Sequence, residues 1–146
     1  MTDPRDLVER YALGVDERDL DAVAALFTTD ALLLLPDPPA HLTPVTEHHG
    51  REGVRAALEA VTAVRATVHE ITGQVLDAGE THDVLHGRVT GVAHHYVEHG
   101  DEVIDVLWRL RYDDLYRRVE GRWLIARRAL TIRALERRSG VTIPRN

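Results

Sequence analysis

The sequence contains no cysteine and no lysine, and its only serine is Ser139, near the C-terminus. The absence of cysteine excludes disulfides, thiolate nucleophiles and zinc–thiolate centres. The absence of lysine excludes Schiff-base chemistry, and one serine in a polar segment is a poor candidate for a nucleophile. Any catalysis must therefore depend on His, Asp, Glu, Tyr or Arg side chains, or on a bound metal ion.

Long apolar runs are also missing. Runs such as Ala31–Leu35 are far too short to cross a bilayer, and charged residues occupy the positions where a signal peptide would be apolar. The formal net charge of −6 gives no reason to expect a nucleic acid as partner. We therefore expect a cytoplasmic protein that binds neither membranes nor nucleic acids.

The chain length of 146 residues is sufficient for one domain with its own core. Apolar residues make up 44% of the sequence and charged residues 29%, which is ordinary for a globular protein. We expect one domain over residues 1–136 and a C-terminal tail over residues 137–146.

The first part of the chain has helical periodicity. Asp3 followed by proline is typical of a helix start, and apolar residues then recur at helical spacing as far as Val15. Asp19 can cap a second short helix. The leucine-rich stretch after it predicts a strand, residues 36–39 predict an exposed loop, and residues 51–64 predict a third helix.

From residue 67 onward the periodicity changes to that of strands, separated by turns. The predicted strands are Thr67–Asp77, His82–Glu98, Glu102–Val119 and Arg122–Leu135. Helices followed by long antiparallel strands are typical of the α+β class. We expect a curved antiparallel sheet wrapped around the N-terminal helices, with a pocket between its concave face and the helical layer.

Asp16 lies at the break between the first two helices, beside much apolar surface. A carboxylate in such a place requires a partner, and the best candidate is His69, which lies among apolar residues in a predicted strand. A carboxylate–imidazole pair is the usual apparatus of proton transfer. The alternative interpretation is that Asp16 only caps a helix and His69 is a half-exposed strand residue.

Strand alternation places two further polar side chains on apolar faces. Arg128 either binds an anionic or carbonyl oxygen of a ligand, or forms a structural ion pair with Asp16 or another carboxylate. Tyr112 shares a face with Trp108 and Leu110, and it either faces the pocket or merely packs.

Nine histidines raise the question of a metal site. His82 and His86 are four residues apart, as are His95 and His99, but this spacing brings ligands together only on a helix. These segments are predicted to be strand and turn, and the histidines at positions 41, 48 and 49 are assigned to loops. We therefore expect neither a metal nor another cofactor.

Four motifs occur in an order that resembles a known family: Tyr11…Asp16-x-x-Asp19, Leu26-Phe-x-x-Asp30, Gly50-Arg-Glu-Gly-Val and Arg117-Arg-x-x-Gly121-Arg-Trp123. Together they resemble the SnoaL-like branch of the nuclear-transport-factor-2-like superfamily, over about residues 5 to 135. Similar members include scytalone dehydratase, lindane dehydrochlorinase and bile-acid 7α-dehydratase, which are cofactor-free lyases on a cone-shaped α+β barrel. Many other relatives have no known activity, so the fold alone does not imply catalysis.

Carried over position by position, the resemblance implies site residues of two kinds. The catalytic pair is Asp16 and His69, and the substrate-binding residues are Tyr11, His94, Tyr112 and Arg128. In the predicted strand His82–Glu98, alternation instead places His95 on the face with the smaller and more apolar side chains. A bulge at Gly87 or Gly91 would exchange the faces of the residues that follow it. His94 and His95 therefore remain alternatives. A strand tyrosine and a late-strand serine of scytalone dehydratase are absent, so scytalone itself is not the expected substrate.

The expected function is therefore a cofactor-independent lyase or isomerase, similar to a dehydratase, that abstracts a proton from a hydrophobic cyclic small molecule. Two alternatives are a non-catalytic small-molecule-binding domain and an assembly subunit similar to the β-subunit of ring-hydroxylating dioxygenases. Relatives form dimers or trimers, and the partly apolar strands Val103–Tyr116 and Ala126–Ile132 favour a homodimer or homotrimer formed through the outer face of the sheet.

Overall fold

The computed structural model describes residues 3–144, which form helices first and long strands afterwards. The helices are α1 (Pro4–Asp16), α2 (Leu20–Ala24), α3 (Gly50–Leu58) and the 3-10 helix η1 (Glu59–Ala63). The strands are β1 (Phe27–Asp37), β2 (His41–His49), β3 (Ala66–Ala78), β4 (Val84–His99), β5 (Glu102–Val119) and β6 (Arg122–Arg138). The predicted α+β class is confirmed.

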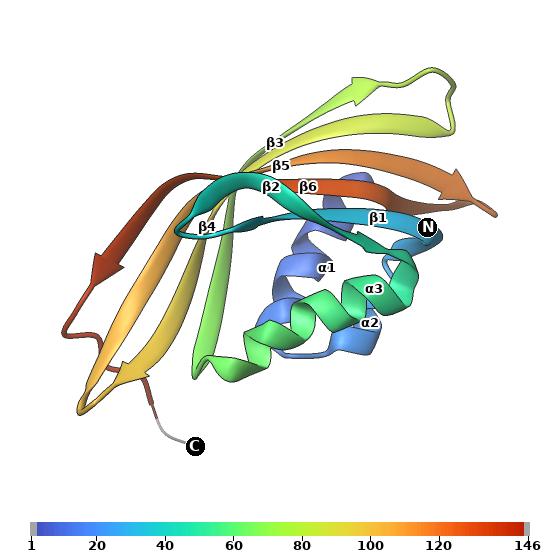
Figure 1. The fold of residues 1–146 in the computed structure, drawn as a ribbon. Helices are drawn as coiled ribbons and strands as arrows, with labels where there is room; N and C mark the ends of the chain where they lie inside the picture. The colour runs from blue at the N-terminus through green and yellow to red at the C-terminus, as the bar shows by residue number, and fades with distance from the viewer. Residues whose placement is uncertain (1–2, 145–146) are drawn as a thin grey trace.

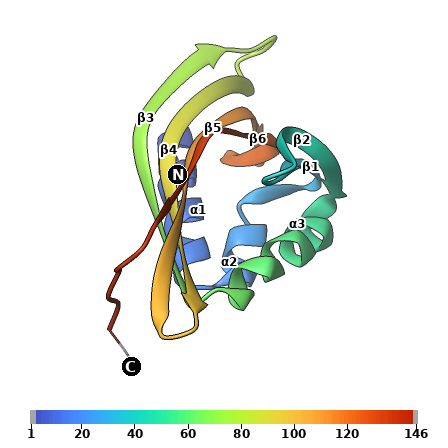
Figure 2. The same cartoon turned by 60° about the vertical axis from the view of Figure 1, so that its left-hand side comes forward.

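The strands form one sheet in the order β2-β1-β6-β5-β4-β3. Neighbouring strands are antiparallel except β1 and β6, which pair in parallel. The sheet is strongly curved, and α1, α2 and α3 lie against its concave face (Figures 1 and 2). This is the curved sheet wrapped around N-terminal helices that the sequence predicts.

The largest difference from the prediction is β2, because no strand is predicted there and the histidines at positions 41, 48 and 49 are assigned to loops. β2 pairs with the end of β1 and forms an edge of the sheet, with mostly exposed side chains. An edge strand buries little apolar surface, so its sequence carries little alternation, and it tolerates Pro44. At the other end of the chain, β6 includes Arg137 and Arg138, which were assigned to the tail. Residues 1, 2, 145 and 146 lie outside the described part.

Two N-cap side chains fix the starts of α1 and α2, and a glycine allows the two helices to pack closely together. Asp3 accepts a hydrogen bond from the backbone N–H of Arg5 at 2.8 Å, and Asp19 accepts one from that of Ala22 at 3.2 Å, as predicted for the starts of α1 and α2. A Cβ atom at Gly14 would lie 2.6 Å from Cγ2 of Val23, so the two helices approach as closely as they do only because Gly14 has no side chain.

The core fills the space between the helices and the sheet. The buried face of α1 contributes Leu7, Val8 and Val15, which pack in one cluster with Phe27 and Ile125. Further along the same concave face, residues of the sheet line a cavity. Within residues 3–144, no helix combines the length and the apolar character needed to cross a membrane.

Candidate functional site

A cavity of about 570 Å³ lies between the concave face of the sheet and the helices α1, α3 and η1. Its walls are mainly apolar, with Leu58, Trp108 and Leu110 among them. Within residues 3–144, the lining side chains that carry nitrogen or hydroxyl groups are Tyr11, His69, His95, Trp108, Tyr112 and Arg137. Size and composition are those of a site for a small hydrophobic ligand.

Asp16 and His69 are in direct contact at the wall of this cavity. Asp16 is the last residue of α1, and its Oδ1 accepts a hydrogen bond from Nδ1 of His69 at 2.7 Å. The same oxygen accepts from Oγ1 of Thr67 at 2.9 Å, and Oδ2 accepts from the backbone N–H of His69 at 2.8 Å. Three hydrogen bonds therefore hold the carboxylate against β3 and fix the orientation of the imidazole.

The second ring nitrogen of His69 is available to a ligand. The His69 side chain is 10% exposed and lines the cavity. Because a carboxylate only accepts hydrogen bonds, Nδ1 of the neutral ring carries the proton and Nε2 has a free lone pair. No group among residues 3–144 forms a hydrogen bond with Nε2. The arrangement can therefore accept a proton from a bound ligand and stabilise the resulting imidazolium.

His95, and not His94, lines the cavity. The β4–β5 ladder is regular along all of β4, and the bulge that changes the β3 register lies between Ile71 and Gly73. The strict alternation of β4 is therefore preserved, and it turns His95 toward the concave face. This resolves the alternative that the sequence left open, and the assignment of His94 to the pocket is wrong.

His95 is held in one orientation and is uncharged. Its Nδ1 donates a hydrogen bond to the Val106 carbonyl at 2.9 Å, and its ring centroid lies 4.2 Å from that of Trp108 and 6.1 Å from that of His69. Burial lowers the pKa of His95 in spite of that hydrogen bond, so the ring is neutral near pH 7. A neutral His95 offers Nε2 as a hydrogen-bond acceptor close to His69.

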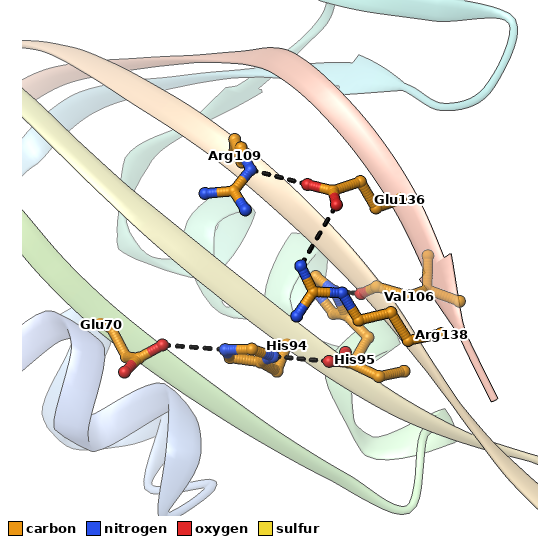
Figure 3. Close-up of polar contacts among 8 residues, drawn as sticks. Glu70, His94, His95, Val106, Arg109, Glu136 and Arg138 are labelled. Atoms are coloured by element: carbon orange, nitrogen blue, oxygen red, sulfur yellow. Dashed lines mark hydrogen bonds and ion pairs between the residues drawn. The ribbon is translucent and has the colours of Figure 1, made fainter. Parts of the chain in front are cut away.

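His94 lies on the outer face of the sheet between two carboxylates (Figure 3). Its Nε2 is 2.8 Å from Glu70 and its Nδ1 is 2.6 Å from Asp105. Burial acts to lower the pKa of His94, but the hydrogen bonds and negative charges of Asp105 and Glu70 outweigh it, and the pKa is raised. A protonated His94 donates from both nitrogens, so it joins β3, β4 and β5 on this face.

We expect the His94→Gln variant to remove part of the pH dependence of stability. A folded-state pKa above the unfolded value of 6.5 means that protonated His94 stabilises the fold at low pH, and that this contribution is lost as the pH rises through the folded-state pKa. Urea unfolding from roughly pH 6 to roughly pH 9 measures it. Wild type should lose more unfolding free energy over this range than His94→Gln, while a His99→Gln control should follow wild type. Parallel curves for wild type and His94→Gln would contradict the assignment.

Arg128 is completely buried and lies behind the cavity, not in its lining. Its Nε and Nη2 donate to the two oxygens of Asp114 at 2.9 and 2.7 Å. The guanidinium carbon lies 3.8 Å from the ring centroid of Tyr112 and 4.3 Å from that of Tyr11. Of the two interpretations of Arg128, the contacts fit the structural ion pair, with Asp114 as partner instead of Asp16.

Tyr11 and Tyr112 line the cavity and are almost completely buried, with ring centroids 5.9 Å apart. Burial raises the pKa of both phenols, so both carry their protons near neutral pH. The phenols are therefore possible hydrogen-bond donors to a ligand oxygen. The ion pair of Arg128 and Asp114 supports them from behind, and Asp114 also accepts from the Tyr116 hydroxyl at 2.6 Å.

Three residues with clear roles here were not identified from the sequence. Thr67 shares a strand face with His69, so a period of two would have pointed to it. Asp114 becomes visible only through the β5–β6 register, which pairs it with Arg128. Arg137 was assigned to the tail, although it lines the cavity. No group of three or more His, Asp or Glu side chains within the described chain is placed to hold a metal ion.

Comparisons with known proteins agree on one family and fold. Residues 2–129 match the model of the SnoaL-like domain family. A hexachlorocyclohexane dehydrochlorinase from Novosphingobium barchaimii is 19% identical, with a TM-score of 0.77 over 97% of this chain and 92% of that one. A proposed scytalone dehydratase from Novosphingobium aromaticivorans is 22% identical, with a TM-score of 0.75 over 90% of this chain and 83% of that one.

A third similar structure is that of a proposed aromatic ring hydroxylase from Novosphingobium aromaticivorans. It is 26% identical to this chain, with a TM-score of 0.76 over 92% of this chain and 90% of that one. No protein of curated function matches the chain in sequence. The structural likenesses therefore support the fold, and the chemistry must be argued from the cavity.

Proposed function

The chain belongs to the SnoaL-like domain family, which includes dehydratases and dehydrochlorinases, and we propose that it is a cofactor-independent lyase or isomerase. Its substrate would be a hydrophobic cyclic small molecule. One observation carries the proposal: Nδ1 of His69 is bound to Asp16 at 2.7 Å, while its Nε2 is available in a largely apolar cavity.

In the proposed mechanism, Nε2 of His69 takes a proton from a carbon next to a carbonyl group. The C–H electron pair forms a new carbon–carbon double bond, and the carbonyl oxygen becomes an enolate. Asp16 stabilises the imidazolium, and the phenols of Tyr11 and Tyr112 donate hydrogen bonds to the developing oxyanion. Arg128 is a positioning residue that keeps both phenols in place.

The second step depends on the substrate. If the carbon next to the enolate carries a hydroxyl or halide, the enolate electrons expel it, and His69 returns its proton to the hydroxide or releases it with the halide. If the substrate instead carries a carbon–carbon double bond next to the carbon that loses its proton, the enolate is a dienolate, His69 returns the proton to its far carbon, and the double bond moves. Dehydration, hydrogen-halide elimination and isomerisation therefore share the first step, and the residues of the cavity define that step.

Two features weigh against the alternative functions. A non-catalytic binding domain would be favoured by an unpaired, exposed His69, whereas His69 is paired with Asp16 and mostly buried. An assembly subunit would require a larger partner and a cone that is empty or filled in, whereas this cavity is lined by a histidine that a carboxylate holds in one orientation. We also propose a homodimer or homotrimer formed through the outer face of the sheet, where the half-exposed side chains of Val68 and Val75 lie.

Deuterium exchange tests the proposed first step without knowledge of the leaving group. Cyclic ketones such as 2-tetralone have acidic protons next to the carbonyl, and NMR in D₂O follows their replacement. We expect the protein to accelerate exchange well above the rate in buffer, with a rate that saturates as the ketone fills the cavity. Exchange no faster than in buffer for every ketone that binds would overturn the proposal.

A further inference from the structure

The lining of the cavity has an unbalanced charge. Among the lining residues of the described part of the chain, Arg137 is the one permanently charged side chain, and none is an aspartate or glutamate. Asp16 lies behind His69, with both oxygens engaged in hydrogen bonds. His95 is neutral because burial lowers its pKa. The cavity therefore presents one uncompensated positive charge to a ligand.

Arg137 is directed to the cavity by the alternation of β6. It pairs with Val106, which pairs with His95, and all three line the cavity. Its neighbours Glu136 and Arg138 lie on the outer face, where Glu136 contacts Arg109 at 2.6 Å and Arg138 at 3.2 Å (Figure 3). Arg137 has no ion pair or side-chain hydrogen bond with any residue of the described chain.

Arg137 also lies at the opposite side of the cavity from the proposed base. One row across the sheet consists of Thr67, His95, Val106 and Arg137, and His69 follows Thr67 on the same face of β3. Three strand spacings amount to about 14 Å along this row. Arg137 is exposed, which places it at the mouth, whereas His69 is mostly buried. A cyclic ligand can therefore reach both residues with different ends.

We propose that Arg137 binds a carboxylate of the ligand, so that the substrate class is a hydrophobic cyclic carboxylic acid. The ring system would lie against Trp108 and Leu110, with the carboxylate at the mouth and the acidic C–H near His69. The planar guanidinium of arginine matches a carboxylate with two parallel hydrogen bonds. The inference rests on the proposed function for the position of the reacting carbon, but the carboxylate preference is a property of binding alone.

Two small molecules that share one aromatic ring system test this inference, because one carries a carboxylate and the other an uncharged amide. 2-Naphthylacetic acid and 2-naphthylacetamide have the same ring and nearly the same shape, and calorimetry at neutral pH gives the dissociation constant of each. We expect wild type to bind the acid about five-fold more tightly, the upper end of what an exposed ion pair supplies. Arg137→Gln should bind both probes equally, and Arg137→Lys should keep part of the preference because the charge remains.

Arg133→Gln is the matched control. Arg133 is also exposed on β6 and has no side-chain partner in the described chain, but it does not line the cavity. Its removal changes the net charge equally and should leave the preference for the acid intact. Equal binding of the two probes by wild type, or an unchanged preference in Arg137→Gln, would overturn the inference. Loss of the preference in Arg133→Gln as well would overturn it too, because net charge would then explain the effect.

The same variants separate this inference from the proposed function. His69→Gln should keep the preference for the acid, whereas deuterium exchange into bound ketones should be lost. A preference that depends on Arg137 without any catalysed exchange would support a carboxylate site and contradict the lyase or isomerase function. Catalysed exchange without a preference for the acid would support the lyase or isomerase function and contradict the carboxylate site.

Discussion

Deuterium exchange into a bound cyclic ketone should fall by about 10²- to 10⁴-fold when His69 is replaced by glutamine, which is the usual contribution of a general base. The glutamine amide can still donate a hydrogen bond toward Asp16, so the fold and the cavity should be preserved. It cannot accept a proton from carbon, because an amide is far too weak a base. The measurement is the exchange rate by NMR at a saturating ketone concentration.

A second histidine variant separates this effect from a general loss of histidine. His99 is exposed at the end of β4 and does not line the cavity. His99→Gln should exchange at the wild-type rate. If His69→Gln retained the wild-type rate as well, the proton would have to leave through another group, and the role assigned to His69 would be wrong.

Replacement of Asp114 by asparagine should cost about 3–5 kcal/mol of unfolding free energy. The reason is Arg128, whose buried guanidinium would lose the one negative charge that pairs with it among residues 3–144. Arg128 is 0% exposed, so bulk solvent does not reach it to replace that partner, and one of its nitrogens, Nη1, already lacks a hydrogen bond in the described chain. Chemical unfolding in urea measures the loss, provided the transition remains two-state.

Asp113→Asn is the matched control for this variant. Asp113 is the preceding residue of β5, and it forms an ion pair with Arg111 at 2.7 Å, with both side chains more than a third exposed. Exposed pairs of this kind contribute about 0.2–1 kcal/mol. We therefore expect Asp113→Asn to cost far less than Asp114→Asn. Equal losses for the two variants would show that the Asp114–Arg128 pair does not have the structural importance that its burial indicates.

The elements that the sequence predicts well are those with a local physical cause. The starts of α1 and α2 follow from the capping side chains of Asp3 and Asp19, which need only their nearest backbone neighbours. The long strands after residue 66 follow from alternation and turn residues. The contact of Asp16 with His69 could be anticipated because a carboxylate beside apolar surface requires a partner.

The features that the sequence does not predict depend on pairing between distant strands. Alternation places Arg128 on an apolar face, but only the β5–β6 register shows that Asp114 is its partner. Alternation likewise favours His95 over His94 as the histidine that faces the cavity, but a bulge in β4 would have reversed this. The bulge lies in β3 and not in β4, which only the strand registers show. β2 was missed because an exposed edge strand has little apolar periodicity.

Asp16 holds His69 with its proton on Nδ1, so that Nε2 is free to take a proton from the ligand. Long-range ¹H–¹⁵N NMR of the histidine side chains, at a pH where the His69 ring is uncharged, tests this directly and needs no substrate. We predict a protonated Nδ1 and an unprotonated Nε2 for His69 in wild type, with this preference weakened in Asp16→Asn. A His69 ring that carries its proton on Nε2 in wild type would mean that Nε2 cannot accept a proton from the ligand and that His69 is not the base.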